Sequence, residues 1–127
     1  MWLSPVLLLL ILLGYSTASG QITGPVTVSG SEQGSLTVTC HYDPYWTTHK
    51  KWWCRGADWG SCVILVMTTG SNQKVKKDRV SIRDYQKKLT FTVTMENLRR
   101  DDADTYWCGI EKDGPDHRVK VEVTIVS

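Results

Sequence analysis

Hydrophobic and polar residues alternate along most of this chain. In the clearest runs, at 36–42, 89–95 and 119–125, apolar residues take every second position and mostly Thr or charged residues stand between them. This period of two predicts half-buried β-strands with one face in a core and the other in water. Gly and Pro separate the runs, which completes an all-β pattern. We place the strands at 23–29, 34–42, 49–55, 62–68, 72–76, 79–84, 88–95, 104–110 and 117–126.

The first twenty residues depart from this pattern. Residues 6–13 form an apolar run of eight, and small or polar residues follow at 16–20. This arrangement is typical of a secretory signal peptide, and the run is far shorter than the roughly 20 residues needed to span a bilayer. We predict a signal peptide at 1–20 and a single mature domain at 21–127. The alternative is an anchor that stays in the membrane.

Two cysteines frame the mature part. Cys40 ends one alternating run, and Cys108 ends a second run 68 positions later. Trp53 stands thirteen positions after the first cysteine, and Tyr106 two positions before the second. This order is that of the immunoglobulin sandwich, in which a disulfide bridges two sheets and a Trp packs on the bridge. The long spacing favours the variable type, which carries extra strands C′ and C″.

The chain has four cysteines, all in the predicted mature part. Four cysteines allow three pairings, and we predict Cys40–Cys108 and Cys54–Cys62. In the chain-entropy model these bridges contribute about 4 and about 2.5 kcal/mol. A zinc site is the alternative, but the sequence has no Cys-x-x-Cys pair and a secreted chain meets an oxidising environment.

Strand alternation also assigns side chains to faces. Trp53 and Tyr106 must face the core with Cys40 and Cys108, so their neighbours Trp52, Cys54 and Trp107 face outward on the same sheet. Variable-type sandwiches also pair an Arg that begins strand D with an Asp six residues before the second cysteine. Here those residues are Arg79 and Asp102. We predict that this ion pair closes one end of the sandwich and has a structural role.

Four segments together are specific enough to suggest a family. They are 51–56 (KWWCRG), 78–84 (DRVSIRD), 91–95 (FTVTM) and 101–110 (DDADTYWCGI). Across about 25–126 the chain resembles the myeloid CMRF-type receptors, also called leukocyte mono-immunoglobulin-like receptors. More distant kin are the polymeric immunoglobulin receptor and the triggering receptors of myeloid cells. The second cysteine pair is typical of this group.

The resemblance implies the extracellular part of a leukocyte receptor that modulates myeloid cell activation. Several relatives bind polar lipids, so the expected ligands are headgroups of the phosphatidylserine, phosphatidylethanolamine or sphingolipid class. Some relatives carry inhibitory tyrosine motifs and others pair with a signalling adaptor through the membrane. The expected location is the outer side of the cell membrane, or secretion.

The loops at one end of a sandwich are its usual binding surface. We predict that Tyr45 and Trp46 in the segment 43–49, together with Asp113 and Asp116 in 111–116, bind the ligand. Aromatic rings suit a membrane interface, and the two aspartates could hold a headgroup amine or a calcium ion. The alternative is that the aromatic pair folds back over the core edge and the aspartates are solvated turn residues.

Several basic residues could favour anionic lipid, although such side chains more often only increase solubility. They are Lys50, Lys51, Arg55, Lys74, Lys76 and Lys77.

Other functions fit less well. The net charge of +2 is too small for a nucleic-acid binder. The three histidines stand in separate segments and no catalytic motif accompanies them, so we predict no enzyme and no resident cofactor. The second hypothesis is a soluble decoy or protein-binding module that pairs with a sibling receptor, or with its own copy, through Trp52 and Trp107. The alternative for these two rings is that they shield the outer disulfide.

Overall fold

The computed structural model describes residues 15–16, 21–58 and 60–127. The predicted signal peptide at 1–20 lies outside the described residues, except for a two-residue strand, β1 (Tyr15–Ser16). Within the described ranges, no helix is both long enough and apolar enough to cross a bilayer.

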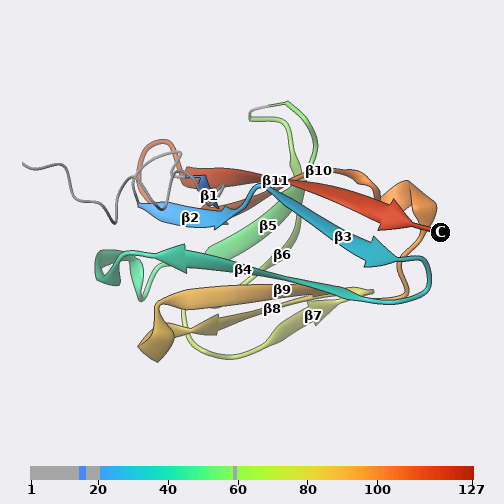
Figure 1. Ribbon diagram of the computed structural model, residues 1–127. Helices are drawn as coiled ribbons and strands as arrows, with labels where there is room; N and C mark the ends of the chain where they lie inside the picture. The colour runs from blue at the N-terminus through green and yellow to red at the C-terminus, as the bar shows by residue number, and fades with distance from the viewer. Residues whose placement is uncertain (1–14, 17–20, 59) are drawn as a thin grey trace, which may run out of the picture.

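The described chain forms two β-sheets that lie face to face (Figure 1). The other strands are β2 (Ile22–Pro25), β3 (Thr27–Ser31), β4 (Leu36–Tyr42), β5 (Lys51–Arg55), β6 (Val63–Met67), β7 (Val75–Lys77), β8 (Val80–Tyr85), β9 (Thr90–Met95), β10 (Asp104–Ile110) and β11 (His117–Val126). Three short 3-10 turns are η1 (Pro44–Trp46), η2 (Gln86–Lys88) and η3 (Arg100–Asp102).

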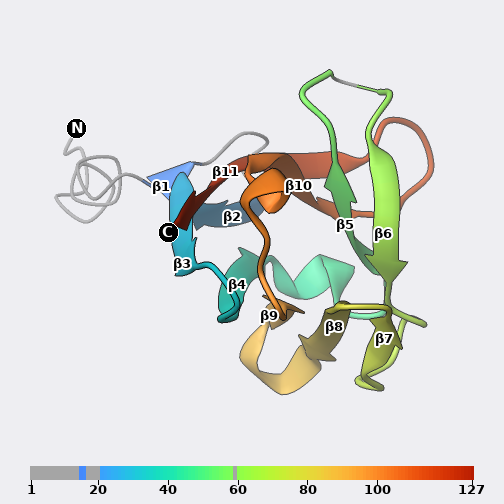
Figure 2. The ribbon, with the colours of Figure 1, turned by 90° about the vertical axis from the view of Figure 1, so that its right-hand side faces the viewer.

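The strand order is that of a variable-type immunoglobulin sandwich. One sheet runs β1-β2-β4-β9-β8-β7 and the other runs β3-β11-β10-β5-β6. The described strands pair antiparallel except β3, which lies parallel to β11. Figure 2 shows the two sheets from the end of the sandwich where the C-terminus lies, with β5 and β6 at the right. The predicted all-β fold class is therefore confirmed.

The core follows the alternation seen in the sequence. Every second residue of β4 and β9 is buried. The Trp53 ring is fully buried and stacks on Tyr106, with ring centroids 5.0 Å apart. The Cys40–Cys108 disulfide joins the two sheets beside them. A second disulfide joins Cys54 in β5 to Cys62 just before β6, so both predicted pairings are confirmed.

Two strand predictions were wrong in detail. The single strand predicted at 23–29 is divided, because the chain changes sheets at Val26: β2 pairs with β4, and β3 pairs with β11. The strand predicted at 72–76 is shorter and begins later, because β7 covers only Val75–Lys77, where it pairs with β8 in the sheet opposite β6. The connection that crosses between the sheets contains Gly70 at a φ of +86°, a backbone conformation that favours glycine.

Candidate ligand-binding site

The segments 43–50 and 111–116 lie at the same end of the sandwich, called here the loop end, at the left of Figure 1. Pro44 begins η1 and provides the backbone angle that a 3-10 turn requires. This turn presents Tyr45 and Trp46 in different ways. The Tyr45 side chain is 77% exposed, whereas Trp46 is half-buried and packs against the core.

Trp46 is fixed by one hydrogen bond and three ring contacts. Its Nε1–H donates to Gln21 Oε1 at 2.9 Å. Its ring meets Tyr45, His49 and His117 edge-on, with centroids 4.7, 4.9 and 5.0 Å away. The structure thus folds Trp46 back over the core edge and leaves Tyr45 as the aromatic group that faces solvent.

Burial lowers the pKa of His117, and the positive charge of Lys112 lowers it further. Asp116 and Asp43 oppose this shift. The imidazole beside Trp46 is therefore held toward its neutral form, because burial disfavours the charged form of a histidine.

The two predicted aspartates also differ. Asp116 is half-buried, and both of its carboxylate oxygens accept hydrogen bonds: Oδ2 from Trp52 Nε1–H at 3.0 Å, and Oδ1 from the Lys112 backbone N–H at 3.2 Å. Asp113 is exposed at the tip of the same segment. Asp116 therefore shapes the segment, and Asp113 is the carboxylate that faces outward.

The two segments enclose an open cleft of about 380 Å³. His49 joins its walls, because His49 Nδ1 lies 2.9 Å from the carbonyl oxygen of Glu111 in a hydrogen bond. The lining residues are Thr48, His49, Lys50, Glu111, Lys112 and Asp113. The residues that line the cleft thus include two lysines and two acidic residues.

A buried ion pair holds the segment 43–50 in place through its backbone carbonyl groups. Lys51 and Asp84 are both fully buried, with Nζ 2.5 Å from Oδ2. Lys51 Nζ also donates to the carbonyl oxygens of His49 at 2.7 Å and Thr47 at 3.2 Å. Tyr42 donates to Asp84 Oδ1 at 2.6 Å, and its ring centroid lies 4.1 Å from the ammonium.

The interpretation of Lys51 as a surface lysine was therefore wrong. Burial lowers the pKa of this ammonium, while Asp84 acts in the opposite direction. A pairing of this kind, with the remaining donors directed at backbone carbonyls, is the arrangement that makes a buried charge tolerable.

Gln86 provides a second anchor. Its side-chain amide donates to the carbonyl oxygens of Thr47, at 2.8 Å, and of Gly70, at 3.0 Å. One amide group therefore ties the segment 43–50 to the connection between β6 and β7. Sequence patterns gave no signal for this contact, because a polar residue in a turn is expected to face solvent.

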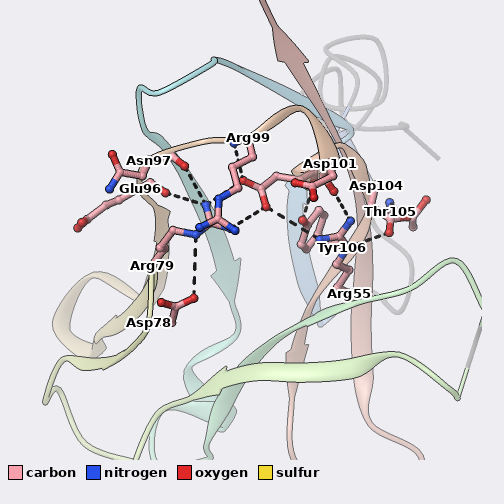
Figure 3. Close-up of polar contacts among 11 residues, drawn as sticks. Arg55, Asp78, Arg79, Glu96, Asn97, Arg99, Asp101, Asp104, Thr105 and Tyr106 are labelled. Carbon is pink, nitrogen blue, oxygen red and sulfur yellow. Dashed lines mark hydrogen bonds and ion pairs between the residues drawn. The ribbon is translucent and has the colours of Figure 1, made fainter.

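The opposite end of the sandwich contains the pair predicted between Arg79 and Asp102 (Figure 3). Two parallel hydrogen bonds, both 2.9 Å, join the guanidinium to the carboxylate. They lower the pKa of Asp102. Tyr106 donates its hydroxyl to the Asp102 carbonyl at 2.6 Å, and Arg55 Nε donates to Asp104 at 2.9 Å.

A larger cavity of about 650 Å³ also lies at this end. Its charged groups include Arg79 and Arg100, which bond to Asp102 and Glu32 of the same chain. These contacts give this end of the sandwich a structural role.

The residues predicted on the outer face of the sheet do lie together, but little of their surface is exposed to solvent. Trp52, Cys54 and Trp107 form a cluster with Cys62 and Met67. Trp52 is 3% exposed and Trp107 is 9% exposed. The Trp52 ring lies directly over Gly109, where an added Cβ would come within 2.0 Å of it, and Trp107 Nε1–H donates to the Gly56 carbonyl. The two rings therefore shield the disulfide and offer little area to a partner.

Among the described residues, no group of three or more His, Cys, Asp or Glu side chains is arranged to hold a metal ion. In particular, both oxygens of Asp116 already accept hydrogen bonds from the protein itself.

Comparison with known proteins defines the class. The family model of the immunoglobulin V-set domain matches residues 23–126, so the chain belongs to the immunoglobulin V-set family. The structure of the first Ig domain of the mouse polymeric immunoglobulin receptor is 31% identical, with a TM-score of 0.66 over 84% of this chain and 96% of that one. The NK cell receptor NKp44, a triggering partner in natural cytotoxicity, is 30% identical, with a TM-score of 0.72 over 78% of this chain and 95% of that one.

Within this class the chain is similar to the CMRF35-like molecules, in agreement with the resemblance seen in the sequence. Human CMRF35-like molecule 5 is 69% identical over 125 residues, which is 98% of this chain and 64% of that protein. The chain spans between 33% and 64% of the length of its CMRF35-like relatives.

Proposed function

We propose that this V-set domain is the ligand-binding ectodomain of a leukocyte immune receptor and recognises polar lipid headgroups. The observation that carries the proposal is a cleft of mixed charge beside one exposed aromatic ring at the loop end. On this proposal the domain acts by binding, at the outer side of the cell membrane or in secreted form. Signalling would require an adaptor or tail outside this chain.

The cleft suits a headgroup that carries both a negative and a positive charge. Lys50 and Lys112 can meet a phosphate group, while Glu111 and Asp113 can meet an amine. Phosphatidylserine, phosphatidylethanolamine and the phosphosphingolipids share this combination of charges. A purely anionic lipid would leave the two carboxylates facing a like charge.

Tyr45 would supply the contact with the bilayer. A tyrosine ring has an apolar body and a polar tip, which suits the depth of the headgroups. Trp46, packed on the core, would hold Tyr45 outward. We therefore assign ligand contact to Tyr45 and Asp113, and support of the site to Trp46 and Asp116.

Sedimentation with lipid vesicles tests the proposal. Vesicles of phosphatidylglycerol, which lacks an amine, are compared with the same vesicles containing phosphatidylserine, phosphatidylethanolamine or a phosphosphingolipid. We expect stronger retention by an amine-bearing lipid, and a loss of about fivefold to tenfold with Tyr45→Ala. Parallel samples with calcium and with a chelator show whether an ion takes part.

Matched variants separate recognition from general charge. Asp113→Asn should weaken binding, whereas Asp58→Asn, which removes an exposed carboxylate from the β5–β6 connection, should not. Val126→Ala removes a side chain that is 56% exposed at the other end of the sandwich, and serves as the control for Tyr45→Ala. Equal retention on every vesicle, or no retention on any, would contradict the proposal.

A further inference from the structure

The strands β4, β9, β8 and β7 lie side by side in one sheet (Figure 1), and one face of this sheet points away from the core. In β8, Ile82 and Asp84 are buried, so the alternating residues Ser81, Arg83 and Tyr85 belong to the outward face. In β4 and β9 the buried residues also alternate, and threonine occupies most of the positions between them. This surface is called here the threonine face.

The strand register places positive charge on one side of the threonine face and hydroxyl groups on the other. Lys76 of β7 stands opposite Ser81, which in turn stands opposite Thr94 of β9. In the neighbouring row, Arg83 stands opposite Thr92. The threonines of β4 continue both rows. Because directly opposed residues project to the same face of a sheet, the cations gather over β7 and β8 and the hydroxyls over β9 and β4.

An open cavity of about 160 Å³ lies where the two sides meet. Lys74 and Arg83 line it together with the outward threonines of β9. Glu96 is the one carboxylate among its lining residues in the described chain, and it is paired, because its Oε2 lies 3.4 Å from Lys76 Nζ. Among the described residues, neither Lys74 nor Arg83 forms an ion pair with a carboxylate. The cavity therefore offers two positive charges to an anion.

Tyr85 holds two cations near one end of the threonine face. Its ring centroid lies 5.1 Å from Arg83 Cζ and 6.0 Å from Lys88 Nζ. An aromatic ring attracts cations through its quadrupole, so this contact positions the guanidinium without neutralising its charge. The Arg83 side chain is exposed, whereas Tyr85 is half-buried. The chain as a whole has a formal net charge of only +2, so the threonine face carries a local excess of positive charge.

We propose that the threonine face binds a sulfated glycan chain. A linear polymer that carries sulfate groups at intervals can meet cations that stand on neighbouring strands, one sulfate to each cation. The hydroxyl groups of its sugar rings donate and accept hydrogen bonds, as threonine hydroxyls do. The segment 74–77 (KVKK) is also of the lysine-rich type found in heparin-binding patches. The surface thus matches both the charge and the sugar rings of such a ligand.

Other partners fit the threonine face less well. A protein partner or a bilayer needs an apolar or aromatic anchor, and none of the exposed large hydrophobic side chains of the described chain belongs to this face. Single-stranded nucleic acid binds by stacking its bases on aromatic rings, whereas the Tyr85 ring already contacts two cations of the protein. Duplex DNA would use the charges alone and leave the threonine hydroxyls without a role.

Surface plasmon resonance of the folded domain on immobilised heparin tests this proposal. We expect binding to heparin, and much weaker binding to desulfated heparin and to hyaluronan, which carries carboxylates but no sulfate. Lys74→Gln and Arg83→Gln should each weaken binding by about fivefold to tenfold and reduce its dependence on salt. Lys120→Gln is the matched control, because Lys120 is an exposed lysine of β11 in the other sheet.

Thr92→Val tests contact with the sugar rings. Valine keeps the shape of threonine but lacks the hydroxyl, so we expect binding to weaken by about threefold to tenfold with the salt dependence unchanged; an unaltered affinity would contradict this contact. Three outcomes would overturn the proposal: no binding to heparin, equal binding to duplex DNA, or equal losses in Arg83→Gln and Lys120→Gln. Thermal melts confirm that each variant is folded. Tyr45→Ala should bind heparin normally, so the lipid and glycan proposals can fail separately.

Discussion

Replacing Lys51 with methionine tests how strongly the buried ion pair supports the loop end. The substitution keeps most of the side-chain volume but removes the ammonium that lies 2.5 Å from Asp84 Oδ2. The carboxylate then keeps only the Tyr42 hydroxyl among the partners described above. Removing one member of a buried pair commonly lowers the free energy of unfolding by about 3–5 kcal/mol. We therefore expect Lys51→Met to reduce the free energy of unfolding by about 3–5 kcal/mol near pH 7, because the buried Asp84 carboxylate loses its opposite charge.

Urea unfolding monitored by tryptophan fluorescence measures these values. Lys50→Met is the matched control: the neighbouring lysine is exposed, and its replacement should change the free energy by no more than about 0.5 kcal/mol. A double variant, Lys51→Met with Asp84→Leu, removes both charges and should recover much of the stability. If Lys51→Met costs less than about 1 kcal/mol, the assignment of a supporting ion pair is refuted.

Three further predictions follow from the packing. Gly109→Ala should lower the free energy of unfolding by about 1–3 kcal/mol in urea, because the added methyl group would meet the Trp52 ring; an unchanged midpoint would contradict the packing described. Replacing both Cys54 and Cys62 with Ala should leave the far-ultraviolet circular dichroism native but reduce stability by about 2.5 kcal/mol, and loss of the fold would contradict this secondary role. Because the folded-state pKa of His117 is lowered below 6.5, its contribution to stability should be complete above that pH and be lost as the pH falls. His117→Asn should therefore flatten the melting temperature between about pH 7 and pH 5, and an unaltered profile would argue against it.

Alternation predicted the strands well where one face is core and the other is water. The predicted bounds of β10 and β11 agree with the structure residue for residue, and in β11 the inner residues Val119, Val121 and Val123 are all buried. The same logic failed at 23–29, where the strand changes sheets. A period of two says which side is buried, but not which neighbouring strand supplies the hydrogen bonds.

The burial of Lys51 could have been predicted from the sequence. It stands two positions before Trp53, so alternation directs it inward, and Asp84 stands two positions after the buried Ile82. Two opposite charges at core-facing positions predict a buried pair. Residue type alone suggested a surface lysine, and that preference outweighed the positional signal. The hydrogen bond that Asp116 accepts from Trp52 could not be predicted in this way, because it depends on how a turn folds over the sheet.

The amide of Gln86 has a consequence for how recognition can change. It stands outside the cleft, yet its two hydrogens fix the carbonyls of two separate connections. A single substitution there would release both at once and raise the entropy that binding must remove. A substitution at position 86 could thus change the affinity for a ligand while every residue that contacts the ligand stays the same.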